Sequence, residues 1–76
     1  MSNFYNGGIF AARCQGSLGA MTQALKAKRL LARSGIAVEI RKLSSDERGC
    51  VYGIEYPCEL LGNVRLILQS NGMEMV

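Results

Sequence analysis

The chain has 76 residues and a net charge of +3, so it can form one small domain near the lower size limit of a self-sufficient core. Hydrophobic residues make up 49% of the chain and charged residues 20%, a composition that excludes an intrinsically disordered protein. No stretch approaches the ~18 consecutive apolar residues of a membrane span, so we expect no membrane partner. Residues 1–8 are polar and end in glycine, which predicts a flexible lead-in rather than a signal peptide.

The first half of the chain predicts a strand, a helix and a second strand. Residues 9–14 contain a short apolar run of strand length. Ser17 fits a helix N-cap and Gly35 fits the glycine that follows a helix, so a helix is expected over residues 17–34. Residues 36–43 then alternate apolar and polar side chains, as a half-buried strand does.

The second half predicts a third strand, a second helix and a fourth strand. Residues 50–56 are rich in β-branched and aromatic side chains and stop at Pro57. Residues 59–71 space their apolar side chains as an amphipathic helix does, and residues 73–76 leave room for a short strand. The order βαββαβ predicts one α+β domain over residues 9–76 with the ferredoxin-like arrangement, a four-stranded antiparallel sheet with both helices on one face.

The cysteine content limits the chemistry. The chain has three cysteines, Cys14, Cys50 and Cys58, and no histidine. A structural zinc site needs four Cys or His ligands, and Ser–His or Cys–His nucleophile pairs need a histidine, so we expect no metal, no cofactor and no such catalytic pair. The odd cysteine count, together with the absence of a signal-like start, predicts a cytoplasmic location.

Cys50 is the most informative residue, because a glycine precedes it and a β-branched, aromatic run follows it. Its thiol is predicted to lie at a loop-to-strand boundary, with Arg48 two residues upstream. A nearby cation and partial exposure favour the thiolate, which is the reactive form of cysteine. Two interpretations stay open: Cys50 is a reactive thiol, or it is a small apolar residue that opens a buried strand.

The predicted topology brings several groups to one corner of the sheet. The first and third strands are neighbours, so Cys14 at the end of the first is expected beside Cys50 at the start of the third. The first helix begins at the same edge, where Gly16, Ser17 and the nearby Arg48 would stabilise a thiolate or another anion. Cys14 is a candidate thiol partner of Cys50, or simply a buried strand residue. A packing role at the opposite edge is expected for Cys58.

A family resemblance accompanies these observations. Residues 24–31, 35–36 and 48–54 resemble a short bacterial family of selenium/sulfur carrier-like proteins, and the similarity extends over residues 9–76. Its distinctive motif is the cysteine after a charged loop, which corresponds to Cys50. The resemblance implies a carrier that holds sulfur or selenium on Cys50 as a persulfide or selenosulfide, with a donor or acceptor protein as partner.

Two functions follow as hypotheses. The first is this sulfur or selenium carrier, a carrier or binding protein rather than an independent enzyme. The second is a non-catalytic ferredoxin-like module for regulation or dimerisation, in which the cysteines are structural. A homodimer through the open sheet face is also expected, because Ile9, Ala11 and Val51 would lie on that face.

A nucleic-acid partner is not expected. RNA binding through a sheet needs exposed aromatic side chains, whereas the alternation of the third strand predicts that its tyrosines point inward. The cations Lys26, Arg29 and Arg33 share one face of the first helix, which is typical of a solvated helix surface.

Overall fold

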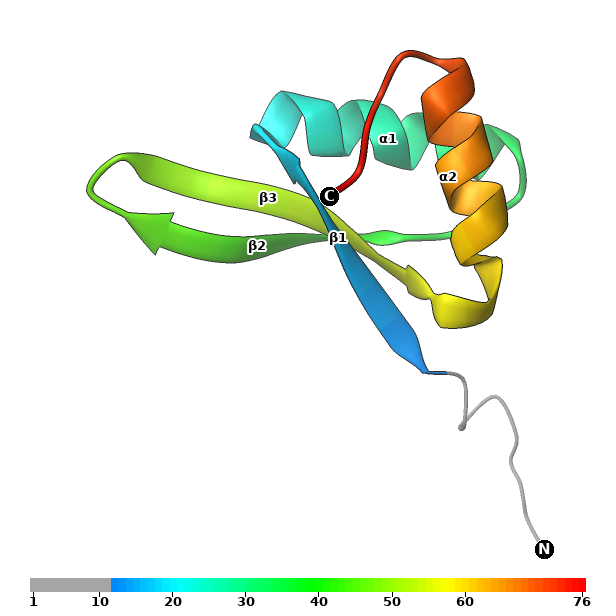
Figure 1. Ribbon diagram of the computed structural model, residues 1–76, viewed down its shortest axis with the longest axis horizontal. Helices are drawn as coiled ribbons and strands as arrows, with labels where there is room; N and C mark the ends of the chain where they lie inside the picture. Colours follow the sequence, from blue (N-terminus) through cyan, green and yellow to red (C-terminus); the bar gives the residue numbers. More distant parts are fainter. Residues whose placement is uncertain (1–11) are drawn as a thin grey trace, which may run out of the picture.

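The computed structural model describes residues 12–76 (Figure 1). Three strands form an antiparallel sheet in the order β1-β3-β2, and Figure 1 shows both helices on the same side of it. The elements in chain order are β1 (Arg13–Gly19), α1 (Met21–Arg33), β2 (Glu39–Asp46), β3 (Gly49–Pro57), the 3-10 turn η3 (Cys58–Leu60) and α2 (Leu61–Ser70). None of the helices in the described residues is long and apolar enough to cross a membrane.

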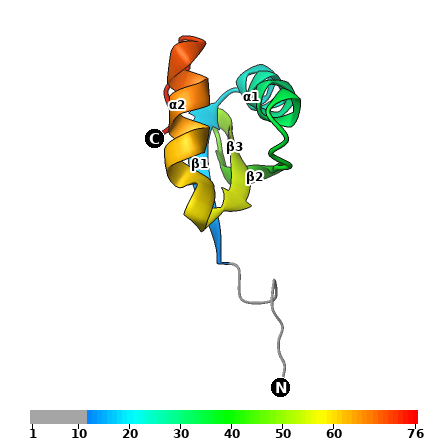
Figure 2. The ribbon, with the colours of Figure 1, turned by 90° about the vertical axis from the view of Figure 1, so that its right-hand side faces the viewer.

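The core lies between the two helices and the central strand β3. Figure 2 shows the strands below α1 and beside α2, and the two helices contact each other. Side chains at helical spacing fill this layer, because residues three, four and seven apart share one helix face. The buried residues are Ala24, Ala27 and Leu31 on α1, Val64 and Leu68 on α2, and Ile54 and Tyr56 on β3.

The prediction of a four-stranded ferredoxin-like sheet is wrong, because the sheet that residues 12–76 form has three strands. After α2 the chain turns at Gly72, which has a φ of 74°, and Met73 packs into the core. A single residue pair then joins the end of the chain to β1. The backbone N–H of Ser17 donates to the carbonyl of Val76 at 2.8 Å, and the N–H of Val76 donates back at 2.9 Å. One such pair does not make a ladder.

The first predicted strand and helix are displaced along the chain. The strand expected at residues 9–14 is β1, which runs to Gly19, and residues 9–11 of that prediction lie outside the described residues. Ser17 is therefore not an N-cap: it is a strand residue opposite Gly53. Helix α1 starts at Met21, after a sharp turn at Gly19, which has a φ of 89°.

The remaining boundaries are closer to prediction. The strand expected at 36–43 starts three residues later as β2, because Ile36 and Val38 are buried in the connection from α1. Strand β3 and helix α2 differ from the predicted 50–56 and 59–71 by one or two residues at each end. The prediction that the first and third strands are neighbours is confirmed.

Strand β1 crosses β3 closely at two glycines. Gly16 is the register partner of Ile54, and Ser17 is the partner of Gly53. A Cβ on Gly53 would overlap the carbonyl oxygen of Gly16, and a Cβ on Gly16 would overlap the side chain of Met75. The close approach of β1 to β3 therefore depends on the absence of a side chain at Gly53, whereas the absence of one at Gly16 leaves room for Met75.

Candidate functional site

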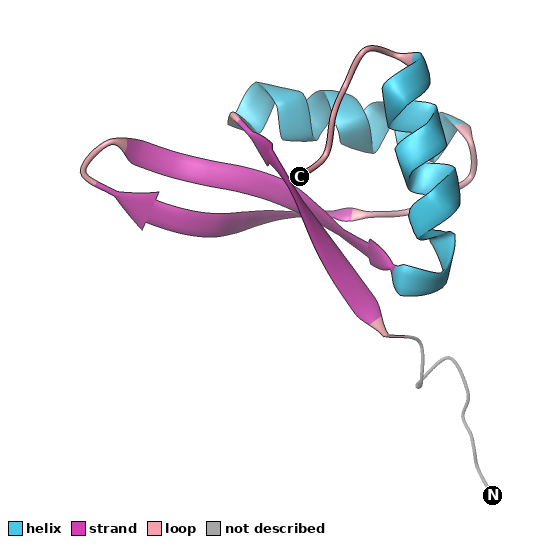
Figure 3. Cartoon of the chain, viewed as in Figure 1, coloured by secondary structure: helices cyan, strands magenta, loops and turns pink. Residues whose placement is uncertain are grey.

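The β2–β3 hairpin extends beyond α1 and ends in a tight turn (Figure 3). Asp46 and Gly49 are register partners, so Glu47 and Arg48 form a two-residue loop. The backbone N–H of Arg48 donates to Asp46 Oδ1 at 2.8 Å, and Gly49 has a φ of 126°, a conformation that L side chains rarely adopt. The turn sequence thus fixes the register of both strands at the tip.

Cys50 lies on this exposed tip with a free thiol. Its register partner on β2 is Ser45, and its Sγ donates to Ser45 Oγ at 3.6 Å. Residues 44–51 are all exposed. The interpretation that Cys50 opens a buried strand is therefore wrong, because the first buried residue of β3 is Gly53, three residues past Cys50. Cys50 is open to a partner molecule from the solvent side.

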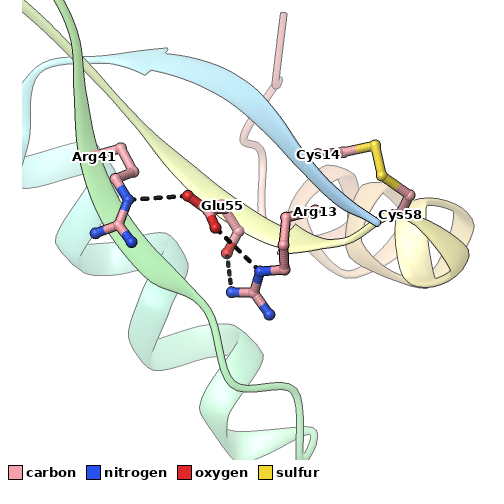
Figure 4. A network of polar contacts seen from close by, with 5 residues as sticks. All are labelled: Arg13, Cys14, Arg41, Glu55 and Cys58. Carbon is pink, nitrogen blue, oxygen red and sulfur yellow. Dashed lines mark hydrogen bonds and ion pairs between the residues drawn. A yellow bond between two sulfur atoms is a disulfide. The ribbon is translucent and has the colours of Figure 1, made fainter. Parts of the chain in front are cut away.

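The other two cysteines form a disulfide (Figure 4). Cys14 near the start of β1 is bonded to Cys58, the first residue of η3, with a Cα–Cα distance of 5.0 Å. The N–H of Cys58 donates to the carbonyl of Ala12 at 3.0 Å, which holds the two segments in the same place. Cys58 does lie past the opposite end of β3 from Cys50, as expected, but the packing role expected for it is wrong, because it is bonded to Cys14.

The predicted corner around Cys50 is not assembled. Cys14 pairs with Tyr56, which is six residues along β3 from Cys50, or about 20 Å at ~3.3 Å per strand residue. Cys14 is therefore not beside Cys50, and the contact predicted between them is wrong. Gly16 and Ser17 lie inside β1 rather than at the start of a helix. Of the predicted site residues, only Arg48 stays near Cys50, in the adjoining turn. The displaced register of β1 causes all of these differences.

The open face of the sheet carries a network of ion pairs, and the sequence analysis predicts neither of these pairs. Glu55 on β3 accepts from Arg13 Nε at 3.1 Å and from Arg41 Nε at 2.9 Å, so one carboxylate joins all three strands (Figure 4). Arg13 Nη2 also donates to the carbonyl oxygen of Glu55 at 3.4 Å. The hydrogen bonds from Arg41 and then Arg13 lower the pKa of Glu55 below its ordinary value.

Glu55 should titrate below an ordinary glutamate, and its titration should depend on Arg41. Because the folded pKa is lowered, the network stabilises the fold at neutral pH, and this contribution is lost as the pH falls through that pKa. Carboxyl-detected NMR titration should show the midpoint rising in Arg41→Gln. Arg48→Gln, which removes a cation from the hairpin tip, is the matched control. Equal midpoints in wild type and Arg41→Gln would contradict the network.

The homodimer through the open face stays a prediction. Val51 is 36% exposed, while Ile9 and Ala11 lie outside the described residues. Within residues 12–76, no group of three or more His, Cys, Asp or Glu side chains is placed to hold a metal ion. Comparison of the chain with protein-family models, curated proteins and solved structures found no match.

Proposed function

We propose that this domain is a sulfur or selenium carrier that holds the chalcogen on Cys50. The observation that carries the proposal is the contrast among the three cysteines. Cys50 is free and exposed on a projecting hairpin, whereas Cys14 and Cys58 are bonded to each other. A carrier thiol must meet first a donor and then an acceptor, and an exposed tip is open to both. The resemblance to selenium/sulfur carrier-like proteins around Cys50 supports the same function.

Loading is a transfer between sulfur atoms without net oxidation. The Cys50 thiolate attacks the outer sulfur of a persulfide, R–S–S⁻, on the donor protein. A bond forms between Cys50 Sγ and that sulfur, the donor's S–S bond breaks, and its thiol sulfur leaves as a thiolate. Unloading is the same exchange with an acceptor nucleophile. A selenium atom in the outer position would give the selenosulfide.

The hydroxyl of Ser45 can form a hydrogen bond with Cys50 in both its thiol and its thiolate form. In the structure its hydroxyl oxygen accepts from the Cys50 thiol. A hydroxyl both donates and accepts, so after the proton leaves to solvent the Ser45 O–H can rotate and donate to the thiolate. Arg48, in the adjoining turn, adds a positive charge near the same tip.

The cytoplasmic location belongs to this proposal. The odd number of cysteines no longer supports it, because two of the three are paired and disulfides are typical of oxidising compartments. The carrier function supports it instead, since the Cys50 thiol must stay reduced between transfers and thiols are kept reduced in the cytosol. The partners are then a donor and an acceptor protein.

Sodium tetrasulfide tests the carrier chemistry without a protein donor. The Cys50 thiolate should take one sulfur from tetrasulfide and release trisulfide, which adds the mass of one sulfur atom to the protein. Cyanide should then remove that sulfur as thiocyanate and restore the thiol. Cys50→Ser should neither gain the sulfur nor release thiocyanate, and peptide mapping should find Cys14 and Cys58 unchanged. A wild-type protein that gains no sulfur at Cys50 would contradict the carrier function. The non-catalytic module would then be the remaining hypothesis.

A further inference from the structure

Helix α1 carries a positive charge that the described residues do not balance. Its sequence contains four cations and no acidic residue. The four, all exposed, are Lys26, Lys28, Arg29 and Arg33. Both ion pairs found within residues 12–76 lie on the sheet and use Arg13 and Arg41. Residues 1–11 contain no Asp or Glu, so they bring no acidic side chain to α1.

This arrangement does not help the helix itself. Lys26 and Arg29 are three residues apart, and Arg29 and Arg33 are four apart, so both like-charged pairs are neighbours on the helix surface. Such pairs repel and destabilise a helix. Only Arg33, in the last turn, has a favourable position relative to the helix dipole. The cluster is better explained by an anionic surface on another molecule.

An exposed apolar strip runs between these cations. Met21 is 40% exposed and Leu25 is 38% exposed, although both are large hydrophobic residues. They are four residues apart and therefore lie along one side of α1. Each residue of a helix is rotated by roughly 100° about the helix axis. This rotation places Lys28 on one side of the strip and Arg29 on the other, three and four residues after Leu25. The surface is thus apolar at the start of α1 and basic farther along the helix.

We propose that this side of α1 docks into an apolar groove with an acidic rim on a partner protein, in the helix-in-groove manner. Arg and Met are enriched in protein–protein interfaces, and a groove would cover the apolar strip while its acids meet the cations. Phosphates of a nucleic acid would satisfy the cations but leave Met21 and Leu25 exposed. Charge complementarity and the strip together therefore favour an acidic protein.

The position of α1 connects this surface with Cys50. Gly19 is the register partner of Tyr52, and α1 begins at Met21, so the start of the helix lies near the base of the hairpin. Figure 3 shows the hairpin extending beyond that end of α1. A partner docked on α1 is therefore near the thiol. We assign this partner as the enzyme that loads or unloads Cys50, an identification that rests on the proposed function.

NMR titration with a short amphipathic Glu/Leu peptide tests the surface. The amide shifts should concentrate in α1, and binding should weaken as salt is added. Lys28→Gln/Arg29→Gln should weaken binding by about tenfold, and Met21→Ser/Leu25→Ser should also weaken it. Lys42→Gln/Arg65→Gln, which removes two exposed cations elsewhere, is the matched control and should bind as wild type does.

Several outcomes would overturn the docking proposal. The control pair could weaken peptide binding as much as Lys28→Gln/Arg29→Gln does, or the protein could bind a duplex DNA of similar length more tightly than the peptide. The peptide could shift amide signals outside α1, or the α1 signals could shift when the protein is concentrated without peptide. The last would indicate a second copy of this chain as the occupant. Two further measurements separate the proposals: Cys50→Ser should bind the peptide unchanged, and Lys28→Gln/Arg29→Gln should accept sulfur from tetrasulfide at the wild-type rate. A wild-type protein that accepts sulfur but does not bind the peptide contradicts only the docking proposal. A wild-type protein that binds the peptide but accepts no sulfur contradicts only the carrier function.

Discussion

Replacing both Cys14 and Cys58 with Ser should lower the free energy of unfolding by roughly 4 kcal/mol under non-reducing conditions. The two cysteines are 44 positions apart, so their bond closes a long loop and restricts the unfolded chain. The bond also ties the start of β1 to the turn before α2, which are distant in sequence. A domain of this size has a small core, and such a link is a large part of its stability.

Urea unfolding of wild type and the double variant, with and without reductant, measures this effect. Wild type with reductant should unfold at nearly the same urea concentration as the double variant, because both lack the cross-link. Cys50→Ser is the matched control and should retain wild-type stability, since its side chain is exposed and outside the bond. A wild-type protein whose unfolding does not respond to reductant would contradict the Cys14–Cys58 disulfide.

Gly53→Ala should destabilise the domain by about 2 kcal/mol or more, the cost of overpacking a tight contact. The new methyl group would meet the carbonyl oxygen of Gly16, and backbone atoms at this crossing cannot move aside as a flexible side chain does. Strands β1 and β3 would have to separate at the centre of the sheet. Thermal unfolding of the purified variant gives the change directly.

Gly62→Ala is the matched control for this substitution. Gly62 lies in the first turn of α2, and a Cβ there meets no other atom within 4 Å. Alanine should therefore stabilise that helix by up to about 1 kcal/mol. A Gly53→Ala variant as stable as Gly62→Ala would contradict the close crossing of β1 over β3.

The helices and the central strand could be predicted because their patterns are local. The apolar positions of α1 and α2 follow the helical period, and Pro57 marks the end of β3. The alternation of β3 also predicts that its tyrosines point inward, and Tyr56 is buried in the core. These assignments need only the chain's own periodicity, and the structure agrees with them.

Strand β1 could not be placed from sequence, because its position depends on a distant partner. Residues 15–19 include two glycines and only one large apolar residue, Leu18, so their intrinsic strand propensity is low. They form a strand because β3 offers hydrogen bonds and Gly53 permits close approach. The apolar run at residues 9–12 has the higher strand propensity, so the sequence predicts a strand that ends at Cys14, whereas Cys14 lies near the start of β1.

The cysteine pairing and the ion network were missed for the same reason. Once β1 is aligned with β3, Cys14 lies opposite Tyr56 and thus near Cys58, and Arg13 lies near Glu55. Neither contact leaves a local sequence signal, since each joins residues more than 40 positions apart. The exposure of Cys50 has a similar origin: the hairpin continues past the helices that would have covered it.

Intact-mass analysis of the protein isolated from cells without reductant tests the carrier function most directly. We expect a fraction of the wild-type chains to carry the extra mass of a sulfur or selenium atom. Reductant should remove the added atom, peptide mapping should place it on Cys50, and Cys50→Ala should lack it. A wild-type protein that carries no such adduct, or an adduct that persists in Cys50→Ala, would contradict the assignment of Cys50 as the carrier thiol.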